Sequence, residues 1–155
     1  MIAAHVSTLL ISRVSEAGDQ LIGEPDFARW ARLLQAVQRL DLASVDLRLQ
    51  RRGRVLLIDG ELRLQGLLRC ERCLGDMPCD IRQQVRVGVA DTEAALVAID
   101  AERELVMAAD GKLAVQDWLE EEALLALPLL PRCMEWSSGI CPVSGIEVPS
   151  LGANQ

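Results

Sequence analysis

The strongest constraint on the fold of this chain is an alternation of apolar and polar residues between Val45 and Val89. A period of two residues is typical of a β-strand with one buried face. The alternation is interrupted at residues 51–53 and again over residues 70–78, and both interruptions contain turn residues such as glycine. We therefore expect three strands that form an antiparallel meander.

Helical periodicity flanks these strands on both sides. Apolar residues at helical spacing predict an amphipathic helix over Phe27–Leu40 and a second helix over Leu113–Leu127, where Pro128 stops it. The sequence thus predicts two main helices that pack on the sheet.

The expected fold class is α+β, with an antiparallel β-meander or partly closed sheet packed with two main helices. Residues 1–12 are expected to form a strand, and residues 94–107 either short strands or a mobile acidic excursion. No internal repeat or second core is visible. We expect a single α+β domain over residues 1–142, followed by a flexible C-terminal tail over residues 143–155.

The composition excludes several classes of protein. Of the 155 residues, 50% are hydrophobic and 25% are charged, which is typical of a soluble globular domain. No apolar run reaches the roughly 20 residues needed to cross a bilayer, and the N-terminus lacks the basic start of a secretory signal. We therefore expect a cytoplasmic protein with no membrane contact. One phenylalanine and three tryptophans are too few for a base-stacking RNA platform.

The formal net charge of −7 is distributed unevenly. Between Arg48 and Arg86 there are nine arginines and five acids, whereas from Val87 onward three basic residues accompany twelve acids. The acidic half should repel phosphate and attract a basic protein. The best feature for direct RNA binding is the basic turn formed by Arg51, Arg52 and Arg54.

The five cysteines raise the question of a metal. A Cys-x-x-Cys turn can direct two thiolates at one ion, and Cys70 and Cys73 have this spacing. Cys133 and Cys141 could supply a second pair, which would complete one structural Zn²⁺ site. Two alternatives stay open, namely that the thiols are small core residues and that Cys70 and Cys73 form a redox pair.

Three consecutive glutamates lie in the second predicted helix. At 100° per residue Glu122 falls on the apolar face, whereas Glu120 and Glu121 point away from it. A buried Glu122 carboxylate needs a partner, and Arg72 at the cysteine turn is the expected one. No histidine, nucleophile or second acid accompanies Glu122, so the sequence predicts no active site and no enzyme.

Two stretches of the chain resemble the YceD family. They are Leu68–Leu74, which reads LRCERCL, and Leu119–Pro131, which reads LEEEALLALPLLP; a short GKL at residues 111–113 precedes the second. The resemblance covers about residues 45–141. The residues that match the family pattern are Cys70, Arg72, Cys73, Glu120, Glu122, Pro128, Pro131 and Cys141. Cys133 stands where many relatives have histidine, an exchange that leaves a zinc site intact.

The resemblance implies a non-enzymatic factor in 23S rRNA accumulation and large ribosomal subunit assembly, which acts through a protein- or RNA-binding surface. The implied partners are a ribosomal protein or assembly factor of the large subunit, or a 23S rRNA precursor. Two alternatives are a zinc-stabilised protein that binds RNA directly and a thiol oxidoreductase. The expected binding residues, apart from the basic turn, are Arg72, Glu120, Glu121 and Glu122.

Overall fold

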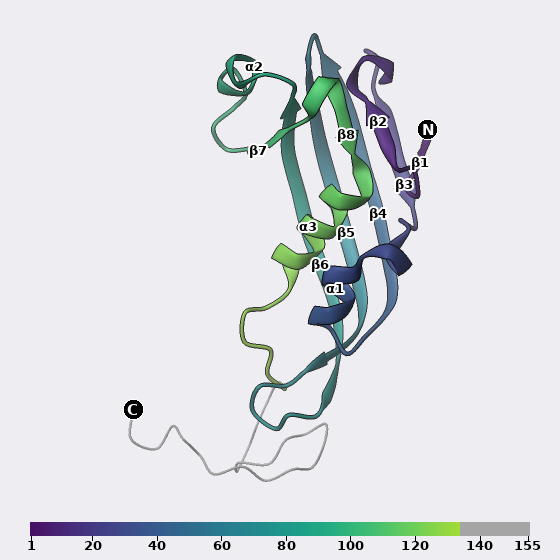
Figure 1. The fold of residues 1–155 in the computed structure, drawn as a ribbon, viewed down its shortest axis with the longest axis vertical. Helices are drawn as coiled ribbons and strands as arrows, with labels where there is room; N and C mark the ends of the chain where they lie inside the picture. The colour runs from purple at the N-terminus through teal and green to yellow at the C-terminus, as the bar shows by residue number, and fades with distance from the viewer. Residues whose placement is uncertain (134–155) are drawn as a thin grey trace.

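A six-stranded mixed sheet forms the centre of the structure, a computed structural model that describes residues 1–133. Its three long strands are β4 (Arg39–Arg52), β5 (Val55–Arg69) and β6 (Asp76–Ala90), which pair antiparallel in sequence order. The shorter strands are β3 (Asp19–Gly23), antiparallel to β4, and β1 (Ile2–Ala3) and β7 (Glu104–Met107), parallel to β3 and β6 respectively. The sheet order is β1-β3-β4-β5-β6-β7 (Figure 1).

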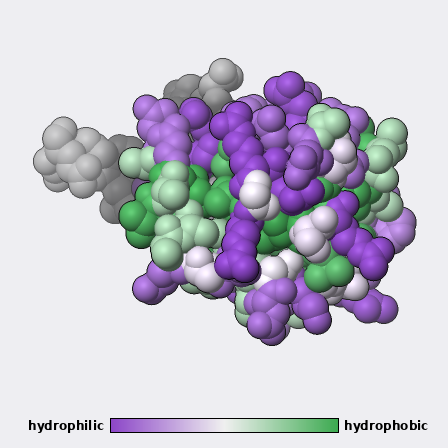
Figure 2. All heavy atoms as spheres, turned by 90° about the horizontal axis from the view of Figure 1, so that it is seen from above, coloured by the Kyte–Doolittle hydropathy of each residue, from purple (hydrophilic) through white to green (hydrophobic). Residues whose placement is uncertain are grey.

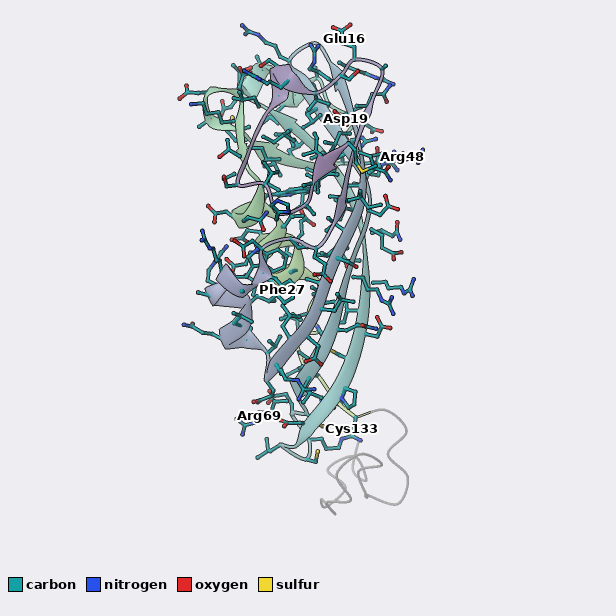
Figure 3. The ribbon with its side chains drawn as sticks, turned by 90° about the vertical axis from the view of Figure 1, so that its right-hand side faces the viewer. Glu16, Asp19, Phe27, Arg48, Arg69 and Cys133 are labelled. Atoms are coloured by element: carbon teal, nitrogen blue, oxygen red, sulfur yellow. The ribbon has the colours of Figure 1, made fainter. Side chains whose placement is uncertain are left out.

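The helices and a separate two-stranded ribbon complete the fold. The ribbon pairs β2 (Thr8–Leu10) with β8 (Lys112–Ala114). The α-helices are α1 (Ala31–Ala36), α2 (Glu93–Val97) and α3 (Val115–Ala126), and single 3₁₀ turns occupy Ile11–Arg13, Phe27–Arg29 and Ala109–Gly111. Figure 3 shows α1 and α3 on one side of the long strands, with Phe27 on that side and Arg48 on the other.

The core lies between the sheet and these helices. The alternation read from the sequence places Val45, Leu47 and Leu49 of β4 inward, next to Leu62, Gly60 and Ile58 of β5. Trp30 from the α1 region and Leu119 of α3 close the core from the other side and are almost fully buried. Burial of one face of each strand thus determines the register of the sheet.

Gly60 allows two strands to approach closely in the middle of the sheet. Its φ is +157°, and a Cβ at this position would lie 2.0 Å from the carbonyl oxygen of Asp46. Any other residue would therefore push β4 and β5 apart at their centre.

The opposite face of the sheet carries charged side chains that pair with one another. Arg63 binds Asp80 in a bidentate arrangement at 2.9 and 3.1 Å, and this guanidinium lowers the pKa of the Asp80 carboxyl to about 2. Arg103, 12% exposed, binds Asp59 through two 3.0 Å contacts. Figure 2, which views the end that includes α2, shows hydrophilic side chains with apolar ones between them.

The predicted fold class is wrong. Strands make up 46% of the structure and helices 24%, the sheet is mixed rather than antiparallel, and only α3, with twelve residues, is a main helix. The expected helix over Phe27–Leu40 consists of a 3₁₀ turn and the six-residue α1, and β4 already begins at Arg39. Pairing of Arg39 and Leu40 with Leu67 and Gly66 of β5 overrides the local helical spacing.

Other segments differ from expectation in detail. Residues 1–12 form the two short strands β1 and β2, and residues 94–107 lie in α2, a connection and β7. Ile99 packs directly over Gly88 of β6, so this excursion is held against the sheet. The expected tail over residues 143–155 lies outside the described residues. Within residues 1–133, no helix has the length and hydropathy to cross a bilayer.

Candidate metal site and acidic groove

Three cysteines from distant parts of the chain form a buried cluster at one end of the sheet. Cys70 and Cys73 belong to the β5–β6 turn, and Cys133 follows α3 by several residues (Figure 3). All three sulfur atoms lie within 4.8 Å of one another, and the side chains of Cys70, Cys73 and Cys133 are 0%, 6% and 5% exposed. We call these three residues the cysteine cluster. Cys141, the fourth predicted ligand, lies outside the described residues.

Backbone geometry holds the cluster in place. The amide of Cys70 donates to the carbonyl of Gly75 at 2.9 Å, and that of Leu74 donates to the carbonyl of Cys70 at 2.8 Å. Leu74 has a φ of +62°, which reverses the chain tightly. The amide of Glu71 donates to the carbonyl of Pro131 at 2.7 Å, so the segment after α3 is attached to the turn through the backbone as well.

Amide groups surround the sulfur atoms. The amides of Arg72, Cys73 and Cys133 donate to Cys70 Sγ at 3.4, 3.5 and 3.2 Å, and the amide of Gly75 donates to Cys73 Sγ at 3.4 Å. Burial raises the pKa of the Cys70 thiol, but the amides of Arg72, Cys73 and Cys133 and the Cys133 thiol outweigh it and bring the pKa down to about 7. These contacts therefore favour the thiolate form of Cys70, which is the form that binds metals.

The donor set fits zinc better than a hard cation. Four sulfurs at roughly 2.3 Å from a tetrahedral Zn²⁺ lie roughly 3.8 Å from one another. Cys73 Sγ and Cys133 Sγ are 3.9 Å apart, close to this separation. Three soft thiolates with no carboxylate among them match structural zinc sites, in which a fourth protein ligand closes the tetrahedron.

Glu122 of α3 faces inward. It is 4% exposed and accepts a hydrogen bond from the indole N–H of Trp118 at 3.2 Å. Burial, followed by the nearby Glu104 carboxylate, raises the pKa of Glu122 to about 7. Arg72 is the partner that the sequence predicts for Glu122, but no ion pair between these two residues forms within residues 1–133.

The solvent-facing orientation predicted for Glu120 is wrong. Glu120 is 6% exposed, and its carboxylate accepts hydrogen bonds from the backbone amides of Arg32 and Leu33 at 3.0 and 3.2 Å. The guanidinium of Arg32 also binds it at 3.0 Å and contacts the exposed Glu121. Because α1 packs across α3, it covers the face of α3 that periodicity assigns to solvent. The sequence contains no signal that Arg32 would pair with Glu120, because this ion pair forms only where α1 and α3 meet.

A groove of about 750 Å³ lies between α3 and β7. We call it the acidic groove. Met107 and Leu125, both among its lining residues, are 48% and 64% exposed. Its charged lining residues are the acids Glu104, Asp117, Glu120, Glu121 and Glu122 and the bases Arg32 and Lys112. The groove therefore has an excess of negative charge.

The basic turn lies at the opposite end of the sheet from the cysteine cluster. It joins β4 to β5, and the 15 residues of β5 separate it from Cys70 by about 50 Å. Arg51 donates to the carbonyl of Val14 at 2.9 Å and pairs with Glu16 at 3.2 Å, whereas Arg52 and Arg54 are exposed. The structure thus keeps the predicted basic and cysteine sites apart.

Comparison with known proteins identifies a family. A family model described as "Large ribosomal RNA subunit accumulation protein YceD" matches residues 58–151. The matched region includes the cysteine cluster and all of α3. No curated protein and no solved structure shows significant similarity to the chain.

Proposed function

The chain belongs to the YceD family, and we propose that it is a non-enzymatic cytoplasmic factor that promotes 23S rRNA accumulation by binding a basic protein of the large ribosomal subunit or its assembly. The family description supports the link to large-subunit rRNA. The acidic groove supports a basic protein as the direct partner, because opposite charges accelerate encounter and select against other partners.

The observation that carries this proposal is the charge of the acidic groove. Four carboxylates and two cations line it besides Glu122, whose raised pKa of about 7 leaves it partly protonated at neutral pH, and Arg32 already pairs with Glu120 and Glu121. A phosphate backbone gains affinity by contact with cations, so this surface would repel RNA. Direct RNA binding would have to use the basic turn, where Arg51 is already engaged by Glu16.

We further propose that Cys70, Cys73 and Cys133 hold one structural Zn²⁺, with Cys141 as the fourth ligand. The convergence of three buried sulfurs supports this assignment. The complete burial of Cys70 argues against a thiol oxidoreductase, whose attacking sulfur must reach a substrate disulfide. The bound ion would stabilise the β5–β6 turn and the segment after α3 without taking part in any reaction.

Depletion of the protein from its own cells tests the assembly role. We expect the ratio of 23S to 16S rRNA to fall, and expression of the unchanged chain to restore it. Expression of Asp117→Lys, which reverses an exposed charge of the acidic groove, should restore the ratio poorly, whereas Glu24→Lys, an equal change at an exposed position that does not line the groove, should restore it fully. A ratio that is unaffected by depletion would contradict the proposed function.

A further inference from the structure

Strand β7 forms one edge of the six-stranded sheet. It pairs with β6 on one side, and nothing in residues 1–133 pairs with its other side. An unpaired strand presents backbone N–H and C=O groups that can bind a further strand. Proteins that recognise extended peptides commonly use such an edge.

The side chains of β7 alternate between two environments. Val106 packs against the core, and Glu104 interacts with Glu122 of α3, so these two residues face the acidic groove. Leu105 and Met107 are 47% and 48% exposed and lie at the alternate positions, and Met107, at the end of the strand, also borders the acidic groove. A strand added beside β7 would therefore have one row of side chains towards α3 and the other row beside exposed apolar residues.

The charges across the acidic groove define what the first row must be. Asp117 and Glu121 are exposed on α3, and Glu104 is exposed on β7. The Arg32 guanidinium is shared between Glu120 and Glu121, which leaves Lys112 as the remaining cation of the groove lining. Lysine or arginine side chains would complement this surface, whereas acidic ones would be repelled.

We propose that a basic, extended segment of the partner protein binds as an additional strand along β7, with its basic side chains towards α3 and its apolar side chains beside Leu105 and Met107. This inference rests on the proposed function and specifies how the partner is recognised. Backbone hydrogen bonds to β7 provide a docking register, and the alternation of basic and apolar side chains provides selectivity.

Two isomeric peptides test the proposal directly. Both are fluorescently labelled octapeptides of alternating lysine and valine, one methylated on the lysine backbone nitrogens and the other on the valine backbone nitrogens. In an extended chain these two sets of N–H groups point to opposite edges, so a peptide that pairs with β7 in a single strand direction, with its lysines towards α3, can do so as only one isomer. We expect fluorescence anisotropy to show binding of the unmethylated peptide and of one isomer, and a loss of about tenfold or more for the other.

Variants of the protein locate the bound peptide. Met107→Lys and Asp117→Lys should each weaken binding about tenfold, whereas Glu24→Lys should leave it within about twofold. Both groove positions are exposed, and circular dichroism melts check that the variants fold. Equal affinity for both isomers or an equal effect of Glu24→Lys would each overturn the proposal.

The two proposals can fail separately. If depletion leaves the rRNA ratio unchanged while one peptide isomer binds selectively, the assembly role is wrong and the peptide site stands. If depletion lowers the ratio but neither isomer is distinguished, the assembly role stands and recognition along β7 is wrong.

Discussion

Replacement of Glu122 by glutamine should change how the stability of the protein depends on pH. The folded state holds this carboxyl at a pKa of about 7, whereas its ordinary value is 4.5. Below pH 4.5 the group is protonated in both the folded and the unfolded chain. As the pH rises towards 7 the unfolded chain releases this proton first, so the free energy of unfolding of the native protein should fall across this interval.

The structure allows the size of this loss to be estimated. A pKa difference of that size corresponds to about 3 kcal/mol if the whole shift is converted. Glu104, which contributes to the shift, is exposed, and solvent screening reduces its effect, so we expect about 1–2 kcal/mol. Glu122→Gln removes the titrating group and keeps the Trp118 indole N–H partnered by an amide oxygen.

Urea unfolding at pH 5.0 and pH 7.5 measures the effect. From pH 5.0 to pH 7.5, the unfolding free energy of the native chain should fall by about 1–2 kcal/mol more than that of Glu122→Gln. Comparison of the two proteins cancels the titration of carboxyls such as Asp80, whose pKa is lowered. Glu24→Gln, at an exposed position, serves as the control. If Glu122→Gln and the native chain lose the same stability between the two pH values, the buried carboxyl is not the cause.

Three further predictions concern stability. Gly60→Ala should lower the free energy of unfolding by about 2–3 kcal/mol in urea titrations, since its Cβ meets the Asp46 carbonyl oxygen; unchanged stability would contradict the close strand approach. Chelation of zinc or Cys133→Ser should lower the melting temperature by on the order of 10 °C, whereas Cys79→Ser, outside the cysteine cluster, should not; metal analysis that finds no zinc would refute the site. Glu120→Gln should cost about 1–3 kcal/mol in urea titrations, because its carboxylate binds a guanidinium and two backbone amides of α1, and a neutral result would refute that role.

The sequence predicts the parts of this fold that depend on local pattern. Strict alternation locates β4, β5 and β6, and helical spacing closed by Pro128 locates α3. The first predicted helix is wrong because its last residues pair with β5, a partner more than twenty positions away along the chain that no local pattern contains. Strand β3 has only five residues, of which Leu21 and Ile22 are apolar, and lies between glycines, so its pattern did not predict a strand.

The candidate sites divide in the same way. The Cys-x-x-Cys spacing indicates a possible ligand pair, but only the folded chain places Cys133 beside it. Periodicity places Glu122 inward, as the structure does, and fails for Glu120 because helix α1 covers that side of α3. Neither the acidic groove nor the open edge of β7 can be read from the sequence, since both arise where separate elements meet.

An ion held by the cysteine cluster would also constrain the unfolded chain. Cys70 and Cys133 are 63 positions apart, and the chain between them contains β6, α2, β7, β8 and α3. A shared ion would close this stretch into a ring, and a cross-link of that span lowers the entropy of the unfolded ensemble by the equivalent of about 4 kcal/mol. Except for α1, every element that borders the acidic groove lies inside that ring. An ion bound at one end of the sheet would therefore help to keep the distant acidic groove assembled.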